Sequence, residues 1–448
     1  LMQFNADGTL DTAGFGNIGV VAHSFTFRNS CKGLAVQPDG KILVAGNENS
    51  SNAGSTIIPC LSRYNSDGTV DYAFGDSGRV ALRFDAISSG TFFKPFVLAN
   101  GQILAVGISS GNINGGTTGY GIMRFNNDGT LDPSFGNNGK VVVPAGVQNK
   151  MYALMQPDGK ILIAGEDRPY PDPPRFGAAR FHQSGVIDST FGTNGKFMVP
   201  FSHNYTDFGS LMLQPDGKVV ITGTRSNPTA FYEFHTLRLT ADGAIDTTFG
   251  TNGFTNVNFN SYVACYDGVI YPNGSILLAG KYPPNNEDAA FAQLTPAGVQ
   301  DSSFGNGTGI FTHPIDTITN RTHARRVLLD SNGRLIVGGL TDNETAFILA
   351  RFDPVFTGLE DAPDKGIAMN LYPNPTSGSL NVSLTLQSAQ SVKIRIIDLQ
   401  GREVFLKDHG LLPSGFRILN LDVSGLSSGS YLLLAETPDG TATRLFMR

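Results

Sequence analysis

The feature that most constrains the fold is a pair of short phrases that alternate along residues 1–353. One phrase reads QPDGKILIAG at 156–165 and returns as QPDGKILVAG at 37–46 and QPDGKVVITG at 214–223. We call its first part the PDGK phrase and its end the AG phrase. The other phrase, typified by DPSFGNNG and called the FG phrase below, repeats along the chain. Its aromatic residue recurs at intervals of 59, 61, 56, 58 and 55 residues. These aromatics are Phe15, Phe74, Phe135, Phe191, Phe249 and Phe304. A chain that repeats one phrase at such a period is an array of similar modules.

Each module divides into four short strands, which in the third module are KVVVP, MYALMQ, KILIAG and AARFH. The Asp-Gly pair at 158–159 favours a tight hairpin, because glycine adopts a positive φ without strain. KVVVP and KILIAG are apolar throughout, so both faces of these strands are expected to be covered. Four-stranded modules of this kind predict the blades of an all-β propeller, with each recurrent phenylalanine at a seam between blades.

The number of blades stays open between six and seven. Six full modules lie between Phe15 and Phe352, and a surplus copy of the strand phrase stands at residues 1–4. That copy could close the ring with the last blade, be the remainder of a further blade, or indicate a shifted blade register. We favour six four-stranded blades, with seven as the alternative.

Composition excludes several classes of function. The net charge is −6 and charged residues make up 16% of the chain, which argues against nucleic-acid or anionic-membrane binding. No apolar run is long enough to span a membrane. The chain opens on Leu1, which we interpret as a processed or truncated start. The cysteines lack metal-ligand spacing, and a Cys31–Cys60 disulfide and small buried thiols are the alternatives.

A recurrent arginine before the turn of the RF phrase, which is AARFH in the third module, argues against calcium. In an EF-hand-like loop the first ligand is an acid five residues before the glycine. That position is held here by Gln3, Arg63, Arg124, Arg180, Arg238 and Gln293. We expect each arginine to pair instead with the aspartate eight residues later and to brace the blade. Because this pairing repeats, it is scaffolding, and no metal, cofactor or catalytic residue is assigned.

The chain changes character after residue 353. Residues 354–366 have the composition of a linker, and 367–448 contain strands such as SLNVSLTL and VKIRII, in which every second residue is apolar. Such alternation is typical of strands with one solvated face, and predicts a small Ig-like β-sandwich of about seven strands.

Two family resemblances follow from these motifs. Residues 1–353 resemble the bacterial delta-60 repeat, found in secreted propeller-like proteins of largely unassigned function. Residues 367–448 resemble the C-terminal sorting domain of cargo of the Bacteroidota type IX secretion (Por) system. The matching positions are Tyr372, Pro373, Asn374, Pro375, Asp398, Gly401, Gly425, Leu426, Gly429, Tyr431 and Arg448.

The second resemblance implies export through the periplasm and outer membrane of a Gram-negative bacterium. It further implies that 367–448 dock to a shuttle and an outer-membrane translocon, and that the tail is cleaved with release or surface attachment of the product.

The sequence supports binding more than catalysis. No nucleophile elbow, P-loop or HExxH motif is present, and the pairs His203 with Asp207 and His235 with Glu233 are expected to be loose surface residues. The variable loops after each AG phrase carry aromatics that could contact a glycan or protein. These candidate rim residues are Tyr120, Tyr170, Phe176, Phe231, Tyr232 and Tyr282. The expectation is a non-enzymatic surface protein for binding, adhesion or gliding motility. The alternative is a polysaccharide hydrolase or lyase with its site on the rim.

Overall fold

The computed structural model describes an all-β chain. Its described part omits residues 24–28, 51–55, 86–87, 114–116, 146, 168–174, 201–205, 227–230, 283–287, 306, 314–321, 331, 342–345, 353–366, 373–375, 377, 387, 399–401, 428 and 439. Every regular element in the remaining residues is a β-strand, which confirms the predicted fold class. Within these residues, no helix has the length and hydropathy that crossing a membrane requires.

Residues 29–352 form a series of sheets in chain order, five with four strands and a last one with three. The first sheet contains β1 (Asn29–Val36), β2 (Ile42–Asn49), β3 (Ile57–Tyr64) and β4 (Arg79–Ala81). The second contains β5 (Ser89–Val97), β6 (Ile103–Ile113), β7 (Thr117–Phe125) and β8 (Lys140–Pro144). The third contains β9 (Val147–Met155), β10 (Ile161–Asp167), β11 (Arg175–Phe181) and β12 (Lys196–Pro200). The fourth contains β13 (Thr206–Leu213), β14 (Val219–Ser226), β15 (Tyr232–Leu239) and β16 (Phe254–Ser261). The fifth contains β17 (Ala264–Ile270), β18 (Ile276–Tyr282), β19 (Asp288–Leu294) and β20 (Ile310–His313). The sixth contains β21 (Thr322–Leu329), β22 (Leu335–Thr341) and β23 (Phe347–Phe352).

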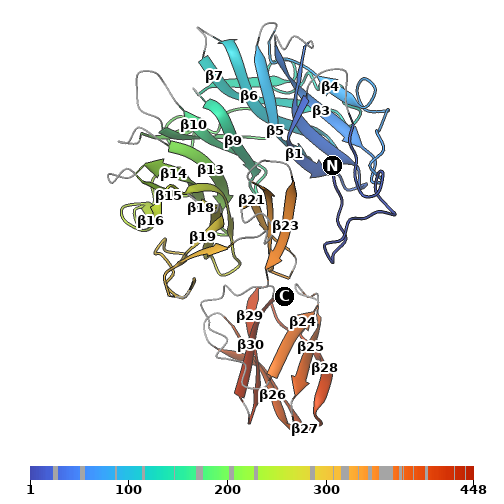
Figure 1. Cartoon of the computed structure of the whole chain (residues 1–448), viewed down its shortest axis with the longest axis vertical. Helices are drawn as coiled ribbons and strands as arrows, with labels where there is room; N and C mark the ends of the chain where they lie inside the picture. The colour runs from blue at the N-terminus through green and yellow to red at the C-terminus, as the bar shows by residue number, and fades with distance from the viewer. Residues whose placement is uncertain are drawn as a thin grey trace. The chain divides into compact units, whose positions relative to one another are not determined.

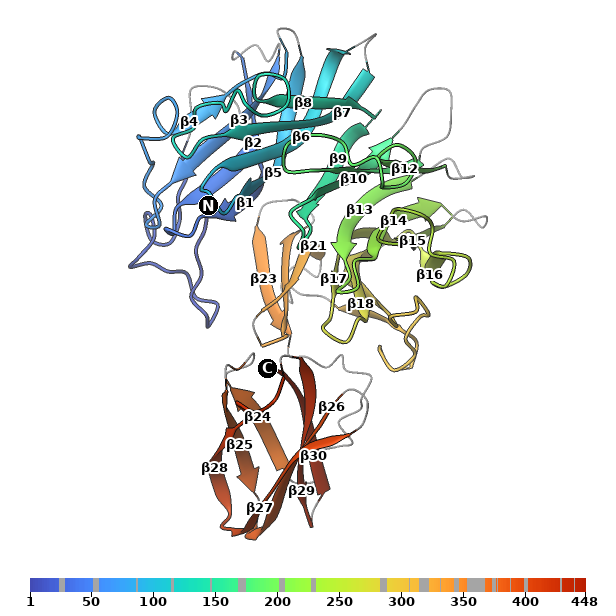
Figure 2. The ribbon, with the colours of Figure 1, turned by 180° about the vertical axis from the view of Figure 1, so that it is seen from behind.

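The sheets are the blades of a β-propeller, with the first strand of each blade toward the centre. The first strands of neighbouring blades, β1 with β5, β5 with β9, β9 with β13, and β13 with β17, contact one another. Figures 1 and 2 show the sheets following one another around this centre. The Tyr152 hydroxyl from β9 donates a hydrogen bond to the Tyr266 carbonyl oxygen from β17, two blades on, at 3.3 Å. Such a bond requires a radial arrangement, since blades stacked along a line would keep these strands apart.

The last glycine of the AG phrase is explained by an irregularity in the first strand. A register shift, or β-bulge, interrupts β5 between Phe92 and Lys94 and β17 between Cys265 and Asp267. A Cβ placed on Gly280 would lie 1.8 Å from the Ala264 carbonyl oxygen of that bulged strand. Only glycine therefore fits at this point of the second strand.

The N-terminal residues contact the first blade through their FG phrase. Met2 bridges to Val20, and the Gly16 amide donates to the Asp67 carbonyl oxygen at 2.8 Å. The same kind of bond joins three later FG phrases to the next blade: Gly75 to Asp128 at 2.8 Å, Gly192 to Asp242 at 2.7 Å and Gly250 to Ala297 at 2.8 Å. Within the described residues the sixth sheet has three strands, β21, β22 and β23. The expectation of four strands in every blade is therefore wrong for this sheet.

The chain forms two compact units, Leu1–Leu328 with Val337–Ala350, and Leu329–Ile336 with Arg351–Arg448. The expected linker, residues 354–366, lies outside the described residues, and the domain limits 1–353 and 367–448 remain predictions.

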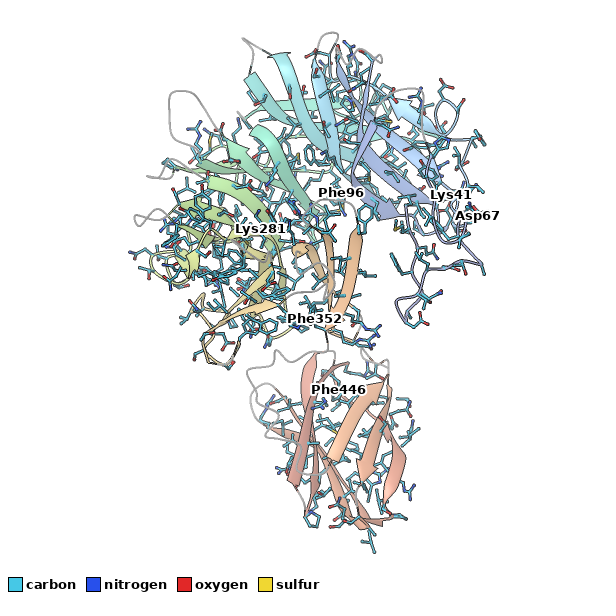
Figure 3. All side chains as sticks on the ribbon, in the orientation of Figure 1. Lys41, Asp67, Phe96, Lys281, Phe352 and Phe446 are labelled. Carbon is cyan, nitrogen blue, oxygen red and sulfur yellow. The ribbon has the colours of Figure 1, made fainter. Side chains whose placement is uncertain are left out.

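The C-terminal strands form two sheets around one core. One sheet has the order β24 (Ile367–Tyr372), β25 (Ser379–Leu386), β28 (Gly415–Asp422). The other has the order β27 (Glu403–Leu412), β26 (Gln390–Asp398), β29 (Ser430–Thr437), β30 (Gly440–Met447). Val382 of the first sheet and Ile394 of the second belong to the same buried cluster, as does Phe446, shown in Figure 3. Seven strands in two sheets are thus present, while the Ig-like classification remains a prediction.

Candidate functional site

The recurrent arginines hold the aspartates that the spacing predicts. In each pair the arginine Nε donates to an aspartate Oδ2. The pairs are Arg63–Asp71, Arg124–Asp132 and Arg180–Asp188 at 2.7 Å, and Arg238–Asp246 at 2.9 Å. In the fifth blade Gln293 occupies the arginine position, and its amide donates to Asp301 at 2.9 Å. The hydrogen bond to the aspartate is therefore kept even where the positive charge is lost.

The same arginine also joins its blade to the next one. The Arg238 guanidinium carbon lies 4.6 Å from the centre of the Phe249 ring, and its Nη1 donates to the Pro296 carbonyl oxygen at 2.6 Å. Phe249 is fully buried, and a Cβ on Gly298 of the next blade would lie 2.6 Å from its ring. Phe15, Phe74, Phe135 and Phe191 lie in the same way beneath a turn glycine of the following blade. The arginine and phenylalanine thus form a structural clamp at the seam.

The lysine of the PDGK phrase contributes a second cation to the clamp. Lys218 Nζ lies 3.3 Å from the Asp246 carboxylate. Burial alone would raise the pKa of Asp246, but the Thr248 hydrogen bonds, the Arg238 charge and Lys218 together lower it to about 2. Figure 3 labels Lys41, which follows β1, and Asp67, which follows β3, at the same end of the first sheet. The arginine–phenylalanine clamps lie at this end of the blades, beside the turns that follow the first and third strands.

The Asx turns beside the clamps have a structural role. Asp67 Oδ1 accepts hydrogen bonds from the Thr69 amide at 2.9 Å and from the Thr69 hydroxyl at 2.7 Å. Asp128 makes the same two bonds with Thr130 at 2.9 and 2.7 Å. These carboxylates close their own turns.

The structure corrects two of the expected rim aromatics. Tyr120 is 2% exposed and donates its hydroxyl to the Gly177 carbonyl oxygen, and Phe176 is fully buried against Phe208. Both lie in the apolar layers between blades, because a neighbouring blade that the sequence cannot place covers each of them. Tyr170 lies outside the described residues.

The other expected rim residues belong to two groups of aromatic rings. The Tyr262 ring lies 5.4 Å from Phe231 and 5.5 Å from Tyr232, in edge-to-face contacts typical of aromatic pairs. Tyr262 is 49% exposed, and Tyr282 lies 6.3 Å from the buried Phe259. Sequence reasoning missed Tyr262 because it follows β16, between the repeated phrases and outside the loops after the AG phrases.

The histidine pairs considered from sequence have other environments. His235 is 1% exposed, its Nδ1 lies 2.6 Å from the Asn256 side-chain oxygen, and its ring stacks on Phe254. Glu233 pairs with Arg225 at 2.6 Å. The expectation of loose surface residues is therefore wrong for His235, which is a packed side chain within β15. His203 lies outside the described residues.

The three cysteines are free thiols. Cys31 and Cys60 both align with Gly46 of β2, from the strands on its two sides. Two strand spacings, about 9.5 Å, separate their backbones, which exceeds the reach of a disulfide.

The candidate sorting residues converge on the C-terminus. Gly429 and Arg448 exchange backbone hydrogen bonds of 2.9 Å. The Arg448 guanidinium donates to the carbonyl oxygens of Val423 at 3.1 Å and Ser424 at 2.9 Å. Gly425 and Leu426 continue this segment, and the Tyr431 hydroxyl donates to the Ser427 carbonyl oxygen at 2.9 Å. The terminal arginine thus caps the LDVSGLSSGSY block.

The other sorting candidates lie apart from this block in the fold. The backbone of Tyr372 ends β24, opposite Asn381. Asp398 accepts hydrogen bonds from the Arg402 amide and Nε at 2.9 and 2.8 Å, which close the turn after β26. Pro373, Asn374, Pro375 and Gly401 lie outside the described residues.

Family profiles match both parts of the chain. A secretion system C-terminal sorting domain matches residues 370–447. A domain of unknown function, DUF5122, described as a beta-propeller, matches 37–74, 98–135, 156–191, 214–249 and 331–355. None of the curated proteins matches the chain.

Solved structures with similar folds are distant. PorZ, a surface component of the type-IX secretion system of Porphyromonas gingivalis, is 13% identical with a TM-score of 0.35. The match covers 96% of this chain and 61% of PorZ, so the chain spans less than two thirds of that protein. A Dyadobacter fermentans protein of unknown function is 14% identical with a TM-score of 0.40, over 74% of this chain and 96% of the other. A PL25 ulvan lyase is 8% identical with a TM-score of 0.36, over 89% of this chain and 98% of the lyase.

Proposed function

From the premise that the chain carries DUF5122 β-propeller repeats and a secretion system C-terminal sorting domain, we propose that it is a non-enzymatic binding protein of the cell surface. The sorting domain identifies the chain as secreted cargo of the type IX secretion system, and this is the observation that carries the proposal. The propeller is the delivered part, and adhesion to a surface glycan or protein is its role.

The export step is assigned to residues 367–448, which engage the secretion shuttle and the outer-membrane translocon. Arg448 is fixed by hydrogen bonds to the carbonyl oxygens of Val423 and Ser424, which supports recognition of this segment after folding. Removing residues 367–448 should leave the protein inside the cell, measured by fractionation and immunoblotting. Arg448→Ala, which removes the cap alone, should reduce surface delivery, whereas Arg417→Ala on the exposed part of the same domain should not. Normal delivery without residues 367–448 would refute the export assignment.

The binding step is assigned to the aromatic group Phe231, Tyr232 and Tyr262. Exposed aromatic rings offer apolar area with few rotatable bonds, so they bind sugars or protein loops at low entropic cost. By contrast, the recurrent charged residues already serve the blade seams. Full-length protein should bind members of a glycan array, and Tyr262→Ala should weaken that binding.

The matched control is Tyr72→Ala, because Tyr72 is a 73% exposed tyrosine on the FG turn of another blade. Equal loss in both variants would contradict the assignment of the site. The bound glycans should also be incubated with the protein and analysed for new reducing ends and unsaturated products. Turnover of any of them would replace the binding proposal with the hydrolase or lyase alternative.

A further inference from the structure

One position of the first strand brings polar and charged side chains from five blades toward the propeller axis. This position lies seven residues before the glycine of each PDG-type turn. Its occupants from the second to the sixth blade are Lys94, Tyr152, Ser210, Asp267 and Arg326. Because first strands surround the centre, residues far apart in sequence meet here.

Two of these side chains are cations, and Arg326 of the sixth blade reaches β9 of the third blade, which neighbours the strand of Lys94. The Arg326 guanidinium carbon lies 4.6 Å from the centre of the Tyr152 ring, which fixes the plane of the guanidinium group. Burial, and then the charge of Arg326, lowers the pKa of Lys94. Lys94 belongs to β5 and Arg326 to β21, and the Arg326 guanidinium lies against the blade next to that of Lys94.

The neighbouring position adds further positive charge. Arg325 lies 4.4 Å and Lys150 Nζ 5.7 Å from the centre of the Tyr266 ring. The Tyr152 hydroxyl donates to the Tyr266 carbonyl oxygen, so the two tyrosine stacks are connected. Three cations thus lie against two tyrosines in a chain whose net charge is −6.

The carboxylates near this cluster already have partners. Both oxygens of Asp207 lie 2.6 Å from Lys150 Nζ. Asp267 accepts hydrogen bonds from the Ser210 hydroxyl at 2.7 Å and from the Val327 amide at 3.0 Å. Burial raises the pKa of Asp267 to about 6 despite these bonds, so it carries less than a full charge in weakly acidic solution.

Among the described residues, Lys94 and Arg326 donate to backbone acceptors only. Lys94 Nζ donates to the Leu34 carbonyl oxygen at 3.4 Å, and Arg326 Nη1 donates to the Arg325 carbonyl oxygen at 3.2 Å. Neither cation forms an ion pair with a carboxylate in the described ranges of the chain. A guanidinium has five donor hydrogens and an ammonium three, so most of their hydrogen-bonding capacity is available to a ligand.

We propose that Lys94 and Arg326 form an oxyanion-binding site on the propeller axis, which takes a carboxylate or sulfate group of an acidic ligand. The planar guanidinium, held against Tyr152, presents two parallel N–H groups to such an oxyanion. Lys94 supplies a point charge from the equivalent position of β5. The side chain of Arg326 is solvent-exposed, so a ligand can reach it. The site is separate from the aromatic rim group and does not depend on the export assignment.

The test is calorimetric titration of the full-length protein at low ionic strength with sodium sulfate and, separately, sodium glucuronate. At least one of the two anions should bind and raise the midpoint of thermal unfolding. Lys94→Met and Arg326→Gln should each weaken that binding by about tenfold or more, as expected for loss of one charge-assisted contact. Binding of sulfate alone, glucuronate alone or both identifies the accepted oxyanion.

The matched control is Lys196→Met. Lys196 likewise donates to a backbone oxygen, that of Pro144 at 2.9 Å, but it lies on β12, the outermost strand of its blade. Since removing one of two neighbouring like charges relieves repulsion, Lys94→Met should not lower the unfolding midpoint without anion. No binding of either anion, or equal weakening in the Lys196→Met control, would overturn the proposal.

Discussion

The clamp at the seam between the fourth and fifth blades should be the most sensitive point of the propeller framework. Arg238→Ala removes the Nε bond to Asp246, the stacking on Phe249 and the bond to the Pro296 carbonyl oxygen. Arg238 and Asp246 are each 5% exposed, so solvent cannot replace the lost cation. The substitution therefore leaves a buried carboxylate with fewer partners and weakens one blade-to-blade contact.

The expected cost follows from the pKa of Asp246. A pKa lowered to about 2 from the usual 3.8 corresponds to about 2 kcal/mol of stabilisation of the ionised carboxylate by all its partners. Removing one member of a buried ion pair typically costs about 3–5 kcal/mol. Thr248 and Lys218 continue to hold Asp246, so we expect Arg238→Ala to cost about 2–3 kcal/mol at pH 7.

The cost should depend on pH in a defined direction. Because the pKa of Asp246 is lowered in the folded state, its stabilising contribution is present above its unfolded pKa near 4 and is lost as the pH falls toward 2. The difference between wild type and Arg238→Ala should therefore shrink over this range. A difference that stayed constant from pH 7 to pH 3 would show that the ion pair does not carry the effect.

Lys218→Ala is the matched control on the same carboxylate. Lys218 is 33% exposed and more distant from Asp246, so its loss should cost less than about 1 kcal/mol. The chain contains no tryptophan, so unfolding is best followed by far-ultraviolet circular dichroism. Native-state hydrogen exchange of the Gly250 amide, which bonds to the Ala297 carbonyl oxygen at 2.8 Å, reports on this seam directly. Equal effects of the two substitutions would refute the reasoning.

Three further outcomes are expected. Gly339→Ala should lower the unfolding midpoint by several degrees, because its Cβ would lie 2.1 Å from a backbone oxygen of β21, whereas Gly338→Ala, with 3.9 Å of space, should be nearly neutral. Maleimide should label Cys31 in the native protein, whereas Cys60, whose pKa burial raises to about 12, should react only after unfolding. Asp267, whose folded pKa is raised to about 6, stabilises the protein at pH values below about 4, and that contribution is lost as the pH rises through 6. Relative to Asp267→Asn, wild type should lose about 2–3 kcal/mol between pH 4 and pH 7, measured by urea titration.

The parts of the fold that sequence predicted well are those that recur. The phenylalanine of each FG phrase, the Asp-Gly turns and the arginine eight residues before an aspartate all have one local geometry, which the chain repeats in blade after blade. Repetition distinguishes a structural requirement from chance, so the clamp at Arg238 and Asp246 could be expected from spacing alone.

The candidate binding residues were predicted less well, because exposure depends on neighbours. Tyr120 and Phe176 stand in strands that another blade covers, so they are buried although their sequence context resembles that of a surface loop. Tyr262, which no motif marks, is exposed beside Phe231 and Tyr232. A single sequence carries no information on which blade lies over which residue.

The sequence by itself determined that the chain is a repeated all-β array followed by a secretion tail, since both are written in local phrases. Only the tertiary structure decided which side chains share the axis. Lys94 and Arg326 are separated by most of the propeller along the chain, and they occupy the same position of the first strand in blades that surround one centre. A single sequence does not show that two such distant cations share the axis, because this depends on how the blades are arranged around the centre.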